Sequence, residues 1–186
     1  VQVLTPGSDQ MAAAMSCATD SFCGVLRFDG GGPYGAWNAD PTVDGTYTTP
    51  ERYSFVAVNG RTARTFPIPK PRYGSYDFAR NSKYDFGTIG GYHSHEPLNR
   101  VSCPTANWCA FVGVHIPLSN GPNDVEFPVL GIYDHGNITV EDLSLAGGDS
   151  ATLAEISCWA PNACRAIGVS HTTVPLPSDF PFSADL

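Results

Sequence analysis

The chain has 186 residues, of which 42% are hydrophobic and 15% are charged, so it can form one sizeable core and about one domain. Ten Lys and Arg against 18 Asp and Glu give a net charge of -8. That acidic balance argues against a nucleic acid or an anionic membrane surface as partner, because both require a basic patch. No apolar run approaches the roughly 18–20 residues that span a bilayer, so no membrane span is expected.

One nine-residue phrase occurs three times and contains every cysteine of the chain. Each copy has a Ser-Cys pair, five further residues, a second Cys and the residue after it. An even number of cysteines at one repeated spacing indicates disulfides, and therefore a secreted, extracellular protein. Local pairing is the simplest connectivity, and zinc is the alternative, although structural zinc sites usually space their thiolates by about two to four residues. The expected pairs are Cys17–Cys23, Cys103–Cys109 and Cys158–Cys164.

The residues around each phrase predict antiparallel strands. An alternating segment enters each copy and a small apolar segment leaves it, which indicates a strand, a tight turn and a second strand. A second hairpin follows the first two copies. One is centred on Asn59-Gly60, the strongest short hairpin signal, and the other on the turn at residues 134–137. The predicted unit therefore has four antiparallel strands and one local disulfide.

The chain is predicted to be a single all-β domain over residues 1–186. Its repeat units cover approximately residues 9–69, 98–147 and 151–170, with insertions at 30–50 and 70–97. The third unit is expected to be cut short by a Pro-rich tail at 174–186, since proline removes a donor that a central strand needs.

The phrase resembles the "SCxxxxxCxAVG" repeat of secreted actinobacterial proteins, whose units resemble β-propeller blades. Cys109-Ala-Phe-Val-Gly113 and Cys164-Arg-Ala-Ile-Gly168 carry the resemblance, and Val58-Asn59-Gly60 is similar to the hairpin that follows each unit. It covers most of residues 9–66 and 98–170. The segment after Cys23 departs from the pattern because it lacks the strand glycine.

The resemblance implies a propeller whose ring is incomplete in this chain alone, because closure needs at least about four blades. Three explanations stay open: insertion 70–97 is a degenerate blade, the chain is a fragment or one subunit of a ring, or the units pack as a sandwich or partial barrel. An unfinished ring exposes strand edges, so another protein chain or self-association is the expected partner.

The candidate metal ligands are His93 and His95, which alternate on one face of an extended segment with Glu96 beside them. The segment resembles the zinc motif of JAMM-type metalloproteases. Glu96 interrupts that motif, and Thr105 stands where an Asp is expected. The alternative is a Gly-rich surface loop with two solvated histidines. Possible third ligands are His115, Asp134 and His135.

The candidate binding residues are the aromatic and acidic side chains of the two insertions. Flat aromatic faces with polar tips suit the recognition of sugars or proteins, although the same rings could fill the core. The set comprises Trp37, Tyr73, Tyr76, Asp77, Tyr84, Asp85 and Tyr92.

These observations favour a secreted, non-enzymatic binding or assembly module that recognises a glycan or a protein through its aromatic insertions, without a cofactor. Two alternatives remain. One is a zinc-dependent metalloenzyme centred on His93 and His95, and the other is a structural subunit of an extracellular assembly. No Gly-x-Ser-x-Gly motif occurs, and no catalytic residue is assigned.

Overall fold

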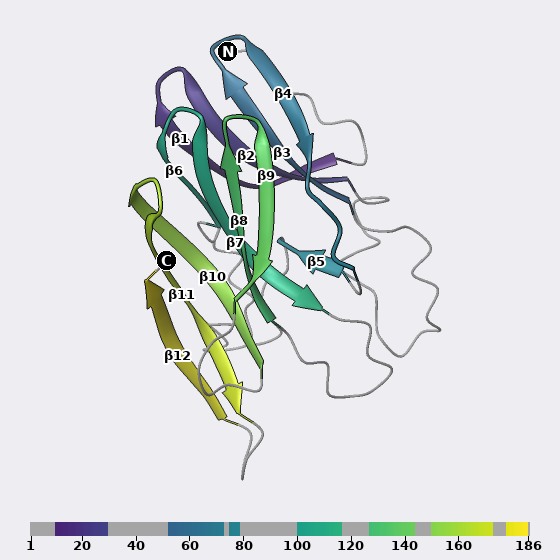
Figure 1. Cartoon of the computed structure of the whole chain (residues 1–186), viewed down its shortest axis with the longest axis vertical. Coiled ribbons are helices and arrows are strands. Elements are labelled where there is room, and N and C mark those ends of the chain that lie inside the picture. The colour runs from purple at the N-terminus through teal and green to yellow at the C-terminus, as the bar shows by residue number, and fades with distance from the viewer. Residues whose placement is uncertain are drawn as a thin grey trace, which may run out of the picture.

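The computed structural model describes residues 10–29, 52–72, 75–78, 100–116, 127–143, 150–172 and 178–185. This part of the chain is all-β, with antiparallel strands in three sheets that follow one another in chain order (Figure 1). We call them sheets A, B and C. The all-β class and the local disulfides are confirmed. Within the described ranges no sheet closes on itself.

Sheet A has the predicted two hairpins, in the order β1-β2-β3-β4. The disulfide-linked hairpin comes first, and the Asn-Gly hairpin follows it. Gly60 adopts a φ of 59°, the left-handed conformation that this turn requires. The strands are β1 (Gln10–Thr19), β2 (Phe22–Asp29), β3 (Arg52–Asn59) and β4 (Thr62–Pro67).

Sheet B repeats this arrangement and gains one short strand from the insertion at 70–97. The repeated strands are β6 (Val101–Thr105), β7 (Trp108–Ile116), β8 (Phe127–Asp134) and β9 (Asn137–Asp142). The added strand β5 (Ser75–Asp77) pairs with β7 on the edge that β6 also uses, beyond the end of β6. In its described part, the insertion therefore extends sheet B.

Sheet C corrects the prediction that the Pro-rich tail lies outside the third unit. Its strands are β10 (Ser150–Ala160), β11 (Ala163–Thr172) and β12 (Ser178–Asp185), and β12 comes from the tail. Pro181 pairs with Val169, and β12 stands at the edge of the described sheet. A proline is tolerated there because an edge strand has donors that no neighbour needs.

Each disulfide links the two strands of one hairpin close to its turn. Cys17 lies directly opposite Cys23, and Cys158 lies directly opposite Cys164. The Cα–Cα distances are 3.9, 4.1 and 4.0 Å for the first, second and third pair. The predicted local connectivity is confirmed.

The three sheets pack face to face in chain order. In sheets A and B, we call the face that meets the next sheet the forward face. In sheet C, the forward face is the equivalent one, which points away from sheet B. The opposite face of each sheet is its rear face. The core between sheets A and B is aromatic: Phe55 stacks on Tyr133 at 4.6 Å and on Phe111 at 5.9 Å between ring centroids. The core between sheets B and C is smaller and mostly aliphatic, formed by Trp108, Ala110, Val112, Leu130, Leu153, Ile156, Cys164 and Ala166.

One hydrogen bond recurs at both contacts between sheets. The main-chain N–H of Cys103 donates to Ser16 Oγ at 3.1 Å, and the N–H of Cys158 donates to Ser102 Oγ at 2.9 Å. The serine of each phrase thus accepts from the first cysteine of the next phrase. This bond fixes how far each sheet is shifted along its neighbour.

We predict that replacing the buried serine of this contact destabilises the fold. Ser102→Ala leaves the Cys158 N–H without its acceptor, which costs about 1–3 kcal/mol of unfolding free energy. Ser157→Ala is the matched control. Ser157 occupies the same place in the third phrase but is exposed, so its replacement changes stability by less than about 0.5 kcal/mol. Urea unfolding measures both, and equal effects would contradict the assigned role.

Candidate functional site

The described residues contain only two of the predicted binding residues. Tyr76 and Asp77 lie on β5, beside the end of β7. Nearby Phe78, from the same aromatic insertion, is fully buried in the core. The other predicted binding and metal residues lie outside the described residues and stay predictions: Trp37, Tyr73, Tyr84, Asp85, Tyr92, His93 and His95.

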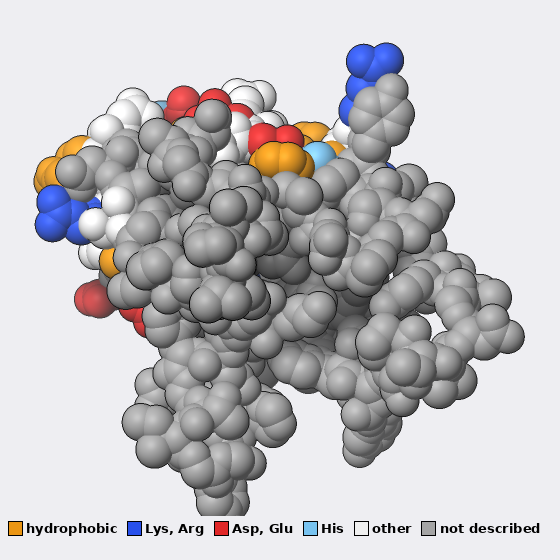
Figure 2. Space-filling model, turned by 90° about the horizontal axis from the view of Figure 1, so that it is seen from below, with side chains coloured by type: hydrophobic (Ala, Val, Ile, Leu, Met, Phe, Trp, Pro, Cys, Tyr) orange, Lys and Arg blue, Asp and Glu red, His pale blue; other side chains and the backbone are white. Residues whose placement is uncertain are grey.

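A polar cluster surrounds His115 near the end of β7. Its Nδ1 lies 2.8 Å from the Asp142 carboxylate of β9, and its ring meets Tyr76 edge-on at 5.3 Å. His115 is buried, whereas Asp142 is half exposed. Seen from below, described hydrophobic and acidic side chains lie beside one another along the upper edge of the surface (Figure 2).

This cluster joins β5 to β7 and β9. A carboxylate that orients an imidazole also occurs in acid–base catalysis. Here the imidazole is only 9% exposed and is enclosed by the Tyr76 and Phe127 rings, so its geometry favours a structural role. Burial, followed by the negative charge of Asp142, raises the pKa of Tyr76 above its ordinary value of 10.0.

We predict that this tyrosine makes the fold sensitive to alkali. Because the folded pKa of Tyr76 is raised, its contribution to stability is complete below about pH 10 and is lost as the pH rises through the folded value. Tyr76→Phe should therefore lose less stability above pH 10 than the wild type. Asp142→Asn should lower the pKa of Tyr76, followed by tyrosinate absorbance. Identical alkaline unfolding of wild type and Tyr76→Phe would contradict the prediction.

The possible third metal ligands do not converge. His115 and His135 lie near opposite ends of β7, and each ring contacts its own carboxylate. Among the described residues, no group of three or more His, Cys, Asp and Glu side chains is arranged to hold a metal ion. Nor does this part of the chain contain a helix long and apolar enough to cross a membrane.

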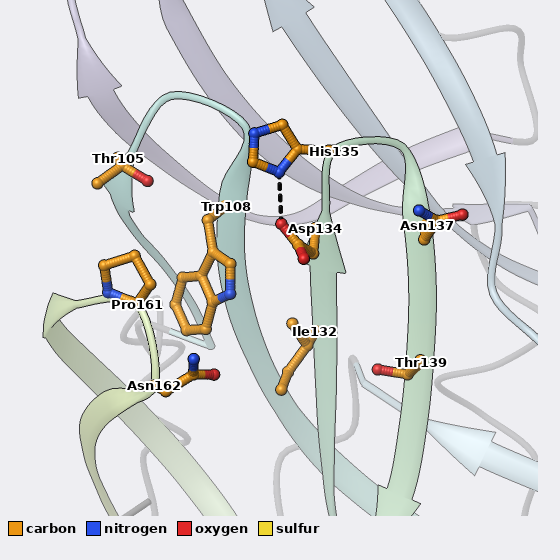
Figure 3. A pocket seen from close by; sticks show the side chains of 9 residues that line it. All are labelled: Thr105, Trp108, Ile132, Asp134, His135, Asn137, Thr139, Pro161 and Asn162. Atoms are coloured by element: carbon orange, nitrogen blue, oxygen red, sulfur yellow. Dashed lines mark hydrogen bonds and ion pairs between the residues drawn. The ribbon is translucent and has the colours of Figure 1, made fainter.

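A hollow of about 450 Å³ lies close to the hairpin turns (Figure 3). It is bounded by sheet B on one side and by the turn between β10 and β11 of sheet C on the other. Trp108 and Ile132 are its apolar side chains from sheet B, and Pro161 comes from the turn between β10 and β11. The remaining lining is polar: Thr105, Asp134, His135, Asn137, Thr139 and Asn162.

The backbone around this hollow is unusual. His135 and Asn162 both have positive φ, at 49° and 57°. His135 takes the place that Gly60 has in sheet A, where the φ is 59°. The His135 N–H donates to Asn107 O at 2.9 Å, and its Nδ1 lies 2.6 Å from Asp134 Oδ1. A side chain is therefore kept at a position where glycine is the less strained residue.

The forward face of sheet C is the most exposed apolar surface of the described chain. Trp159 and Ile167 are 67% and 47% exposed, and Ser157 between their strands is also exposed. The sequence analysis did not single out these residues. Aligning the three phrases by their second cysteine provides the signal, since it places Ile167 where Leu26 and Val112 stand in the other units.

No protein-family model, curated protein or solved structure matches this chain.

Proposed function

We propose that the chain is a secreted, non-enzymatic binding and assembly module made of propeller-like units, and that the forward face of sheet C binds a second copy of the chain. One observation carries the proposal. Residues that are buried on the forward faces of sheets A and B are matched by exposed residues in sheet C. The three disulfides support secretion, since disulfides persist mainly in oxidising compartments.

The equivalent positions show this difference directly. Leu26 and Val112 have no exposed surface, whereas Ile167 is 47% exposed. Ser16 and Ser102 accept the N–H of the next phrase, whereas Ser157 is exposed. Exposed Trp159 stands on the same face, and buried tryptophans often dominate binding energy at interfaces. The face therefore has the properties of an interface.

A further unit of the same kind does not fit this face. Gly24 lies so close to the next disulfide that a Cβ there would be 2.8 Å from Cys103 Sγ and 2.9 Å from Cys109 Sγ. The equivalent residue of sheet B is Ala110, which is buried. Sheet C has Arg165 at this position, and a side chain of this length would leave less room for a disulfide than Gly24 or Ala110 does.

A head-to-tail contact between copies is also disfavoured. It would require an open rear face on sheet A, to receive the forward face of sheet C. Ser54 and Val56 on that rear face are only 4% and 2% exposed, and Val25 is 8% exposed. The rear face of sheet A is thus covered over β2 and β3, although Met15 of β1 is exposed.

A symmetric contact between two forward faces remains. Strand pairing places Glu155 opposite Ile167, and Ser157 opposite Arg165, so all four residues share the forward face. A face that carries both charges can pair with itself, and Arg165, which also makes an interaction within its own chain, would then face Glu155 of the other copy. Such two-fold contacts are the commonest in homo-oligomers. Trp159 and Ile167 supply the apolar surface.

The insertions at 30–50 and 70–97 remain the second candidate surface, for a glycan or another protein. The aromatic and acidic composition of the two insertions supports this second surface. Most of both insertions lies outside the described residues. A zinc-dependent activity at His93 and His95 likewise stays a prediction.

We predict that the wild-type chain forms a dimer, with twice the chain mass of 19.8 kDa by light scattering. Trp159→Ser and Ile167→Ser should each shift the equilibrium to the monomer, because each removes exposed apolar surface from the contact. Met15→Ser is the matched control, since Met15 is 63% exposed on the rear face of sheet A. A monomeric wild type at high concentration would contradict the proposal.

We further predict a charge-swap result that is specific to the symmetric contact. Arg165→Glu and Glu155→Arg should each be monomeric, because each places like charges opposite one another in a dimer of identical copies. An equimolar mixture should form a heterodimer, in which both pairs are again opposite in sign. If the mixture stays monomeric while the wild type dimerises, the contact uses another geometry.

A further inference from the structure

We infer that the hollow between sheets B and C is a binding site for a neutral polyhydroxylated ligand, such as one sugar ring of a glycan. The hollow lies on the forward side of sheet B and is lined by residues separate from the dimer surface of sheet C. The inference therefore stands independently of self-association.

The preceding interface shows how the corresponding space can be filled. Between sheets A and B the corresponding space is filled by Tyr133, whose ring packs against Phe22 at 6.5 Å and Phe66 at 5.2 Å. Tyr133 stands opposite Cys109 on β8. In sheet C, the described pairs between β11 and β12 end at Arg165 and Asp185, one residue short of the equivalent row at Cys164. None of the described residues of β12 supplies a ring at that level.

The lining matches the chemistry of a sugar. Trp108 and Ile132 provide an apolar floor for the C–H face of a ring, although Trp108 itself is only 6% exposed. Asn137 and Asn162 can both donate and accept hydrogen bonds, as can the hydroxyls of Thr105 and Thr139. A hydroxyl group also donates and accepts, so this rim suits a hydroxyl better than a group that only donates or only accepts hydrogen bonds.

The charges disfavour the other small ligands. An anion would meet the Asp134 carboxylate, whose side chain is 58% exposed. A metal ion would find one carboxylate and one imidazole, which is fewer than the usual number of protein ligands. The contact between Asp134 and His135 instead holds both side chains at the rim (Figure 3).

Two hairpin turns from different sheets bring His135 and Asn162 to the hollow, both with positive φ. Asparagine adopts this conformation readily in turns, as Asn107 also does at 78° outside the lining, so His135 is the less common residue of the two. In sheet A, the turn equivalent to that of His135 has glycine instead.

The test is a titration of the isotopically labelled chain with glucose, galactose, mannose and N-acetylglucosamine, followed by NMR. We expect at least one sugar to shift the Trp108 indole N–H and the side-chain amides of Asn137 and Asn162 at millimolar concentrations. Asp134→Ala and Asn162→Ala should each weaken binding about tenfold, since each removes a polar contact to a hydroxyl. Thr139→Tyr should abolish it by filling the hollow.

Asn59→Ala is the matched control, because Asn59 is the equivalent of Asp134 in sheet A, away from the hollow, and its replacement should leave the titration unchanged. Inorganic phosphate is the comparison ligand. A response to phosphate without a response to sugars would overturn the inference. So would the absence of shifts with all four sugars, or sugar shifts that survive Thr139→Tyr. Repeating the titration on Arg165→Glu keeps this result separate from dimerisation.

Discussion

The stacking of this molecule depends on one hydrogen bond, made twice, from the N–H of a cysteine to the serine of the preceding phrase. The disulfide beside that N–H links the two strands of its hairpin close to the turn, which restricts the position of the donor. The serine hydroxyl then sets the position of the next sheet. The aromatic core between sheets A and B and the aliphatic core between sheets B and C are both arranged around this contact.

The same contact makes the third unit different from the others. Sheet C also has the serine on its forward face, but Arg165 stands at the position that Gly24 and Ala110 occupy in the other units. An arginine at this position would crowd a disulfide that stacked on sheet C as the second disulfide stacks on Gly24. An exposed sheet face with tryptophan and isoleucine is a risk for uncontrolled association. A specific symmetric contact would cover it.

The sequence predicted what is local and missed what joins distant residues. The cysteine spacing predicted the three disulfides, and Asn59-Gly60 predicted a turn, because both signals lie within a few residues. The prolines near β12 suggested a tail, since they do not reveal that an edge strand tolerates them. The serine contacts join residues 87 and 56 positions apart, and His115 meets Asp142 from 27 positions away. Such contacts follow from packing, which periodicity does not encode.

Amide hydrogen exchange at the first cysteine of each phrase, Cys17, Cys103 and Cys158, tests most directly the role of the hydrogen bond from cysteine to serine. The N–H groups of Cys103 and Cys158 are predicted to exchange only through opening of the stacked sheets, because each donates to a serine between two units. Cys17 is exposed, and among the described residues its N–H makes no such contact with a serine, so it is predicted to exchange much faster. Equal exchange rates at all three cysteines would contradict the account.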